Sequence, residues 1–407
     1  MNPSNLQGEW RWLGSGFLLM WFSGFGQTYY IAIFAGQLKS TIHLTDGGFG
    51  SLYSVATLGS AALLAWAGKF ADDISVRWLG AAVLGGLAVT SIGMANVNSP
   101  LILGLVFFGL RFFGQGMCTH VAMTAMGRWF NQKRGQAVSI AGLGLPFSEG
   151  LLPLFAVGMI SLVGWRNTWL VSAALLVAVG IPVLITLLKH ERHPTRGPLA
   201  KEHDSRVPDR HHWTRTEVLR NPTFYLLMPI TLAVPFILTG IFINQVPVAE
   251  IKGWDLSLFA ASFPLLAIAH VVAALATGKL VDRFSARHLL AVSLTPLALG
   301  AAILVYATDP LALPVLMMVL GINLGMSSTT HGALWAELYG IDNLGSIRSI
   351  ITAVTVFATA VAPGLIGMLM DHGVALEFQL QVMALYCITA SLLAYGLRPA
   401  LDRIAAS

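Results

Sequence analysis

Two ionisable residues, Arg111 and Glu149, lie deep inside long apolar stretches of this sequence. Arg111 comes about eleven residues, or about 16 Å of helix, after the start of its stretch. Glu149 comes about twelve residues into the next one, at the same rise per residue. A bilayer core is about 30 Å thick, so both side chains are expected near its middle. Because a charge at that depth is costly, both residues are candidates for function.

The two side chains suit complementary chemistry. The guanidinium of Arg111 stays charged and presents a fork of donors that fits a carboxylate. A desolvated carboxyl such as that of Glu149 takes up a proton more readily, and a nearby cation opposes that uptake. We therefore predict that Arg111 binds an anionic substrate and that Glu149 carries a proton. The alternatives are a permanent Arg111–Glu149 ion pair, or an Arg111 that only bonds backbone carbonyls.

Other polar residues inside apolar stretches extend this candidate site. His270 lies deep in its stretch and can change charge near physiological pH, so it is the second candidate for proton coupling. Amides and phenols could orient a small polar substrate or simply bond one helix to another. The residues predicted to bind substrate in this way are Gln27, Tyr29, Tyr30, Asn244, Gln245 and Asn323.

The sequence predicts no metal site, no cofactor and no enzymatic activity. The two cysteines, Cys118 and Cys387, lie in separate apolar runs and form neither a disulfide framework nor a metal-ligand cluster. No Gly-x-Ser-x-Gly or His-Glu-x-x-His motif occurs, and no phosphate-binding loop that would indicate an ATP-driven pump. Five histidines gather between the apolar halves, in spacings that form no compact site, namely His190, His193, His203, His211 and His212.

Composition places these residues in an all-α integral membrane protein. Hydrophobic residues make up 56% of the chain and charged residues only 11%, far below the charged share of soluble domains. Each span needs roughly 20 apolar residues. We predict twelve spans, at about 13–36, 47–68, 78–97, 100–127, 137–160, 165–188, 223–248, 257–280, 287–307, 311–334, 346–370 and 377–397.

The distribution of basic residues predicts the orientation. Residues 189–221 form a charged linker between an N-terminal six-helix bundle (1–188) and a C-terminal one (222–407). With both termini on one side, 20 of the 24 lysines and arginines fall on that side. The positive-inside rule then places the termini and the linker in the cytoplasm, in the cell (inner) membrane. The net charge of +5 is thus a topology signal and does not indicate nucleic-acid binding.

A loop sequence is repeated between the halves. Gly68-Lys-Phe-Ala-Asp-Asp-Ile-Ser-Val-Arg77 matches Gly278-Lys-Leu-Val-Asp-Arg-Phe-Ser-Ala-Arg287 at five of ten positions. A repeat at half the chain length predicts two pseudo-symmetric bundles.

This arrangement resembles the major facilitator superfamily. The family's loop signature is matched by Gly68, Asp72 and Arg77 in the first half and by Gly278, Asp282, Arg283 and Arg287 in the second. The sequence departs from it at Asp73, where the family usually has Arg, and at Ser75 and Ser285, where it usually has Gly. A second family motif appears as Arg111-Phe-Phe-Gly-Gln-Gly116. The resemblance implies alternating access between two bundles, with these loops and Glu337 at the cytoplasmic gate. His120 and His331 are expected toward the cytoplasmic ends of their spans, where they either cap or gate the pathway or bind a ligand.

The loop Trp129-Phe-Asn-Gln-Lys-Arg-Gly-Gln-Ala-Val-Ser-Ile-Ala-Gly142 is similar to that entering the fifth span of monocarboxylate transporters. Those relatives carry an Asp and an Arg on the eighth span, where this chain has only His270. We expect a monomeric transporter of a small organic anion, most simply a monocarboxylate moved with a proton. Alternatives are an exporter of an amphipathic or drug-like compound, and a transporter-derived membrane sensor. Gly144-Leu-Pro146 breaks the Gly-Pro pattern of exporters.

Overall fold

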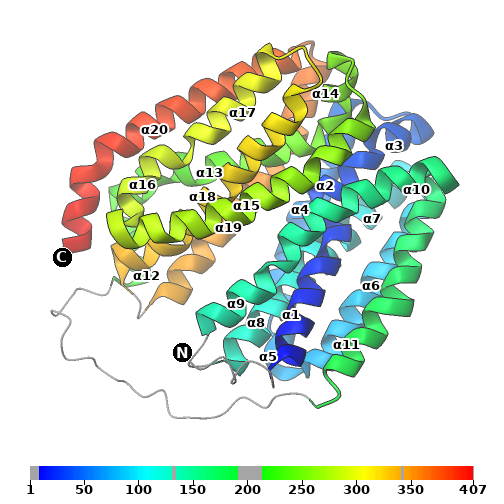
Figure 1. The fold of residues 1–407 in the computed structure, drawn as a ribbon, viewed down its shortest axis with the longest axis horizontal. Coiled ribbons are helices and arrows are strands. Elements are labelled where there is room, and N and C mark those ends of the chain that lie inside the picture. The colour runs from blue at the N-terminus through cyan, green and yellow to red at the C-terminus, as the bar shows by residue number, and fades with distance from the viewer. Residues whose placement is uncertain (1–8, 131–133, 191–212, 341–342, 407) are drawn as a thin grey trace. The chain divides into compact units, whose positions relative to one another are not determined.

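The computed structural model describes residues 9–130, 134–190, 213–340 and 343–406, and every regular element in those ranges is a helix (Figure 1). Helices pair their own backbone N–H and C=O groups, which lipid cannot do for them. The all-helical membrane fold expected from composition is therefore confirmed. Most of the predicted linker, residues 191–212, lies outside the described residues.

The helices of the N-terminal half run from residue 10 to residue 187. They are α1 (Trp10–Phe22), η2 (Ser23–Gly26), α2 (Thr28–Ile31), η3 (Ala32–Phe34), α3 (Ala35–Ile42), α4 (Asp46–Ala67), α5 (Phe70–Asp73), α6 (Val76–Ala95), α7 (Pro100–Gly109), η4 (Leu110–Cys118), α8 (Thr119–Trp129), α9 (Arg134–Gly142), α10 (Gly144–Leu175), η5 (Leu176–Gly180) and α11 (Ile181–Leu187). The segments η4 and η5 are π-helices, in which the turn is wider than in an α-helix.

The C-terminal half consists of α-helices only within the described ranges. They are α12 (Arg215–Arg220), α13 (Pro222–Ile243), α14 (Gln245–Lys252), α15 (Leu256–Phe284), α16 (Ala286–Ser293), α17 (Thr295–Tyr306), α18 (Ala312–Tyr339), α19 (Leu344–Asp371) and α20 (Leu376–Ala406).

Ten helical stretches in the described residues are long and apolar enough to span a membrane, and an eleventh is counted if a bent pair is one span. That pair is Trp10–Gly26 and Thr28–Ile42, which meet at 41°. The predicted fifth and sixth spans lie in one stretch, Gly135–Leu187, of 53 residues. Its regular backbone is interrupted at Gly164, where φ is 80° and ψ is 162°. The number twelve stays a prediction.

Short polar side chains begin several of these helices by accepting hydrogen bonds from otherwise unpaired N–H groups. Thr45 accepts from Gly48 at the start of α4, and Ser99 accepts from Ile102 beside Pro100 at the start of α7. Thr214 and Glu217 form a reciprocal capping box on α12.

The chain divides into two compact units. The first unit comprises Met1–Arg196 together with Phe242–Ile251 and Pro363–Asp371, and the second comprises Gly197–Ile241, Lys252–Ala362 and His372–Ser407. In the first unit α1 packs against α8, α9 and α10, and α6 packs against α10 and α11. In the second unit α15 packs along α18, and α20 along α16 and α17.

Each unit has its own tightly packed interior. In the first, Tyr30 and Phe34 pack on Trp169 with ring centroids 5.1 and 4.8 Å apart. In the second, Gly321 and Gly325 lie against the backbone carbonyls of Leu266 and His270, where a Cβ atom would clash. Small residues at such crossings let membrane helices approach closely.

Candidate functional site

The first span is broken near its middle, and the break is the centre of the candidate site. After α1 the segment Ser23–Gly26 tightens into a 3₁₀ turn, and Gln27 is extended with φ −86° and ψ 153°. The carbonyl of Gln27 still accepts from the N–H groups of Tyr30 and Ile31, so the chain re-enters a helix at once. Broken helices of this kind form ligand and ion sites in many transporters, because they expose backbone groups inside the protein.

Two glycines bring the fourth span against this break. A Cβ atom on Gly114 would lie 2.6 Å from Cα of Gly26, and one on Gly26 would lie 2.7 Å from Cα of Gly114. Gly114 belongs to the π-helix η4, which carries Arg111 on its first turn. Such a wide turn inside a span is common at functional sites. The glycine contact and the wide turn together position Arg111 at the break.

Arg111 is only 2% exposed. Its Nη1 donates to the carbonyl of Gly26 and to Oγ1 of Thr28, each at 3.3 Å. Its guanidinium carbon lies 5.2 Å from the centre of the Tyr53 ring on α4, in a cation–π arrangement. The hydroxyls of Thr28 and Tyr53 are themselves 2.7 Å apart. Each polar contact of Arg111 in the described chain thus goes to an uncharged group, and its buried Nε has no hydrogen-bond partner there.

The other side of the break faces α10. The hydroxyl of Tyr29 lies 2.6 Å from Oγ of Ser148, next to Glu149, which is 8% exposed and interacts electrostatically with Tyr29. A Cβ atom on Gly24 would lie 2.8 Å from the Ser148 hydroxyl and 2.7 Å from that of Tyr29. The break therefore lies between the helix of Arg111 and the helix of Glu149.

The other predicted substrate ligands of the first unit surround the same segment. Gln27 is partly exposed at the break itself. Nε2 of Gln245 donates to the carbonyl of Tyr29 at 3.1 Å, and its Oε1 is buried without a partner among the described residues. Asn244 is buried at the point where α13 gives way to α14, a second interrupted span. Tyr30 instead donates to or accepts from Ser172 at 2.8 Å, within the aromatic interior.

The candidates of the second unit lie on α15 and α18. Nδ2 of Asn323 donates to the carbonyl of Ser293 at 2.9 Å, while its Oδ1 is buried without a partner in the described chain. His270 is partly buried on α15, and its carbonyl faces Gly325. Nδ1 of His331 lies 2.9 Å from the carbonyl of Ser327, one turn earlier on the same helix.

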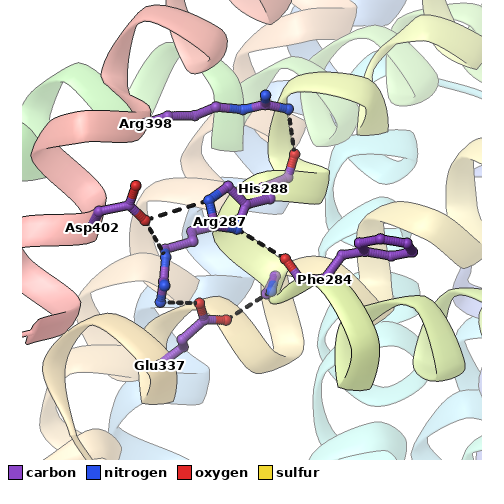
Figure 2. A network of polar contacts seen from close by, with 7 residues as sticks. Phe284, Arg287, His288, Glu337, Arg398 and Asp402 are labelled. Atoms are coloured by element: carbon purple, nitrogen blue, oxygen red, sulfur yellow. Dashed lines mark hydrogen bonds and ion pairs between the residues drawn. The ribbon is translucent and has the colours of Figure 1, made fainter.

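The repeated loops have different local structures. In the first, Nε2 of His120 lies 3.0 Å from the carbonyl of Gly68, and Arg77 is partly exposed beside Trp78. The side chain of Asp72 lies outside the described residues. In the second loop Gly278 is partly exposed, whereas Asp282 and Arg283 are exposed. Arg287 bridges Glu337 and Asp402, and Glu337 also accepts from the N–H of Ala286 at 2.7 Å (Figure 2).

Three residues of the site were missed by the sequence analysis, namely Thr28, Tyr53 and Ser148. Each is a hydroxyl inside an apolar stretch, which is the only sequence signal they carry. Among the described residues, no three His, Cys, Asp or Glu side chains gather in a way that could hold a metal ion.

Comparison with known proteins adds the family. The sequence profile of the Major Facilitator Superfamily matches residues 16–275 and 265–404. The chain belongs to this superfamily. A curated relative, the MFS transporter asaE of Aspergillus flavus, is 24% identical over 334 residues, covering 80% of this chain and 72% of that protein.

Solved structures share the fold at low sequence identity. A bacterial homolog of the human lysosomal transporter Spinster, inward-facing and unoccupied, has a TM-score of 0.73 at 15% identity and covers 97% of this chain and 98% of its own. A mutant of the nucleoside transporter NupG has a TM-score of 0.71 at 14% identity, and the match covers 95% of this chain and 99% of that one. The protein is therefore an integral membrane transporter of this superfamily and not an enzyme.

Proposed function

We propose that the protein is a secondary transporter that moves a small organic anion, most simply a monocarboxylate, together with a proton. The observation that supports this is the buried guanidinium of Arg111, whose contacts in the described chain are all uncharged. A desolvated cation without a counter-charge is costly. An anionic substrate would supply that charge during transport.

The donors of Arg111 are disposed for this role. Nη1 is occupied by Gly26 and Thr28, while Nε points to no acceptor among the described residues. A carboxylate prefers two parallel N–H donors of a guanidinium. Since Arg111 is almost fully buried, the anion would reach it only when the break at Gly26–Thr28 opens. Gln27, Asn244, Gln245 and Asn323, with Tyr29 and Tyr30, would orient the rest of the substrate.

Glu149 would carry the proton, with His270 as a second group. Glu149 is buried beside Tyr29. Tyr29 belongs to the same short segment as Gly26 and Thr28, whose carbonyl and hydroxyl oxygens accept hydrogen bonds from Arg111. A change of charge at either residue therefore acts on the same short segment. Binding of the anion alone would add a negative charge to the site and protonation of Glu149 alone a positive one, whereas the two together leave its net charge unchanged. This favours their joint movement through lipid.

The transport cycle would be alternating access by two six-helix bundles, 1–188 and 222–407, in a monomer with both termini in the cytoplasm. A helix of 53 residues would be about 80 Å long at 1.5 Å per residue, far more than a bilayer. We infer that Gly135–Leu187 turns at Gly164 and forms two spans, which with the bent first span gives twelve.

Two hydrogen bonds within the first unit join α4 to α19. The N–H of Gly47, at the start of α4, donates to Oδ2 of Asp371 at 3.0 Å. The N–H of Gly364 donates to Oγ of Ser54 at 3.0 Å. Both join α4 to residues 364–371 of α19. The loops, with His120, His331 and Glu337, would form the cytoplasmic gate of the cycle.

Uptake into proteoliposomes tests the proposal. The purified protein would be given labelled short-chain monocarboxylates with and without an inward proton gradient. We expect gradient-stimulated accumulation that Arg111→Gln abolishes. Glu149→Gln should abolish accumulation driven by the gradient while leaving exchange of internal for external substrate. Arg111→Lys keeps the charge but not the fork, and should retain partial activity.

Two controls keep the result interpretable. Arg166→Gln removes a partly buried arginine whose donors reach the carbonyls of Ala95 and Val97 in the described chain, so it should leave the coupling unchanged. Thermal unfolding of each variant reports whether it is folded. Accumulation by folded Glu149→Gln under a pH gradient would refute the proton assignment, and uptake by folded Arg111→Gln at the wild-type rate would refute the anion assignment.

A further inference from the structure

A groove lies on the outer face of the second unit, between α16–α17 and α20. Its volume is about 550 Å³. Most of its wall is apolar, and several of the wall residues are exposed, including Val292, Ile388 and Leu392. Exposed aliphatic side chains on a membrane-spanning helix face lipid. The remaining lining residues are Ala291, Thr295, Ala298, Ser391, Tyr395 and Arg398.

One wall of the groove contains the junction between α16 and α17. Leu294 separates α16 from α17 with φ −91° and ψ −9°, and Pro296 follows in the first turn of α17. Proline has no N–H to give to the carbonyl of Val292, four residues earlier. The hydroxyl of Thr295 donates to that carbonyl instead, at 2.7 Å. Two small side chains, Ala291 and Ala298, line the groove on either side of this junction.

Arg398 provides the charge of the groove. Its Nη2 donates to the carbonyl of His288 at 3.0 Å, and its guanidinium carbon lies 4.6 Å from the centre of the Tyr395 ring. Both partners are uncharged groups. Its Nε is buried and, like Oγ of Ser391 in the same wall, has no hydrogen-bond partner in the described chain. The groove thus combines an apolar wall with two unsatisfied polar groups, one of them cationic.

The neighbouring carboxylates are already neutralised. Arg287 donates to Glu337 at 2.7 Å and to Asp402 at 2.6 Å, and Nε2 of His288 lies 3.4 Å from the same oxygen of Asp402. Figure 2 shows Arg398 on the far side of His288 from this network. No ion pair joins Arg398 to a carboxylate within the residues that the structure describes. Its positive charge therefore remains available to a ligand.

We propose that this groove binds an anionic glycerophospholipid of the leaflet next to the loop 278–287. The phosphate would accept from Arg398, a neighbouring headgroup or ester oxygen would accept from Ser391, and an acyl chain would lie along Val292, Ile388 and Leu392. Basic pockets between membrane helices on the cytoplasmic side bind acidic headgroups in this way. The site lies on the outer face of the unit and is independent of the proposed transport chemistry at Arg111.

Native mass spectrometry of the full-length protein with phosphatidylglycerol or phosphatidylcholine tests the site. We expect one phosphatidylglycerol to be retained more tightly than phosphatidylcholine. Arg398→Gln should lower the affinity for phosphatidylglycerol by about five- to tenfold, because one ionic contact near the membrane surface is lost. Arg403→Gln removes an exposed arginine of the same helix outside the groove and should change the affinity less than about twofold.

A second variant distinguishes binding in the groove from general attraction to the basic face of the protein. Ala298→Phe leaves Arg398 in place but fills the space between the helices, and it should reduce lipid retention as Arg398→Gln does. Equal weakening by Arg398→Gln and Arg403→Gln would overturn the proposal, since it would show attraction to the whole basic face. Equal retention of the two lipids by the wild type, or full retention by folded Ala298→Phe, would overturn it as well.

Discussion

Replacement of Ser285 by glycine is expected to stabilise the protein, and the same change at Ser75 to destabilise it. The two serines occupy equivalent places in the repeated loops. Ser285 has φ 67° and ψ 147°, between α15 and α16. That region is almost exclusive to glycine, because a Cβ atom clashes with the backbone. Ser75 has φ −60° and ψ 137°, which any residue adopts.

The difference in free energy can be estimated from these geometries. A non-glycine residue in such a conformation costs about 1–3 kcal/mol. Glycine removes that cost, but its greater conformational entropy in the unfolded chain lowers the free energy of unfolding by about 0.5–1 kcal/mol. The side chain of Ser285 makes no capping hydrogen bond, and Glu337 accepts from the Ala286 N–H in its place. Ser285→Gly should therefore raise the free energy of unfolding by about 1 kcal/mol.

At Ser75 the balance has the opposite sign. Its hydroxyl accepts from the N–H of Trp78 at 3.5 Å, a weak cap on α6. Loss of a cap to glycine costs a few tenths of a kcal/mol, and the unfolded-state entropy adds to it. Ser75→Gly should thus lower the free energy of unfolding by about 1 kcal/mol.

Equilibrium unfolding in mixed micelles of a mild detergent and dodecyl sulfate measures both changes. Ser285→Ala and Ser75→Ala are the matched controls, because alanine removes the hydroxyl and keeps the Cβ atom. We expect Ser285→Ala to be close to neutral and Ser75→Ala to be destabilising. A Ser285→Gly variant that loses as much stability as Ser75→Gly would refute the assignment of strain to Ser285.

Two further predictions concern helix contacts and a helix end. Gly114→Ala should destabilise the protein by about 1–3 kcal/mol, because its Cβ would meet the backbone of Gly26. Gly85→Ala is the control, because a Cβ atom there meets nothing within 4 Å, and it should be neutral or stabilising in the same unfolding assay. Equal effects of the two substitutions would contradict the close crossing. Asp255 outside the spans accepts from the Ser257 N–H at 2.8 Å, which lowers the pKa of its carboxyl below 3.8. The stabilisation it gives is present above that ordinary pKa and is lost as pH falls through the lowered one. The thermal midpoints of wild type and Asp255→Asn should therefore differ by a constant amount near neutral pH and by less at the lowest pH that the protein tolerates. A difference between the midpoints that grows on acidification would contradict the lowered pKa of Asp255.

Composition and the repeat were enough to predict the class of fold. An apolar chain in a bilayer must satisfy its backbone internally, so helices of membrane length followed directly from the length of the apolar stretches. The depth of Arg111 and Glu149 was predicted by counting along those helices at a constant rise per residue, and it stays a prediction. These properties are local, and no other part of the chain changes them.

The partners of those residues were decided by tertiary structure. Thr28 and Tyr53 reach Arg111 only because Gly26 and Gly114 let two spans cross closely, and Ser148 reaches Tyr29 through the same break. The sequence of a single helix does not say which distant helix will face it. Packing between them selects the neighbours, and it also holds a backbone such as that of Ser285 in a conformation that its own sequence disfavours.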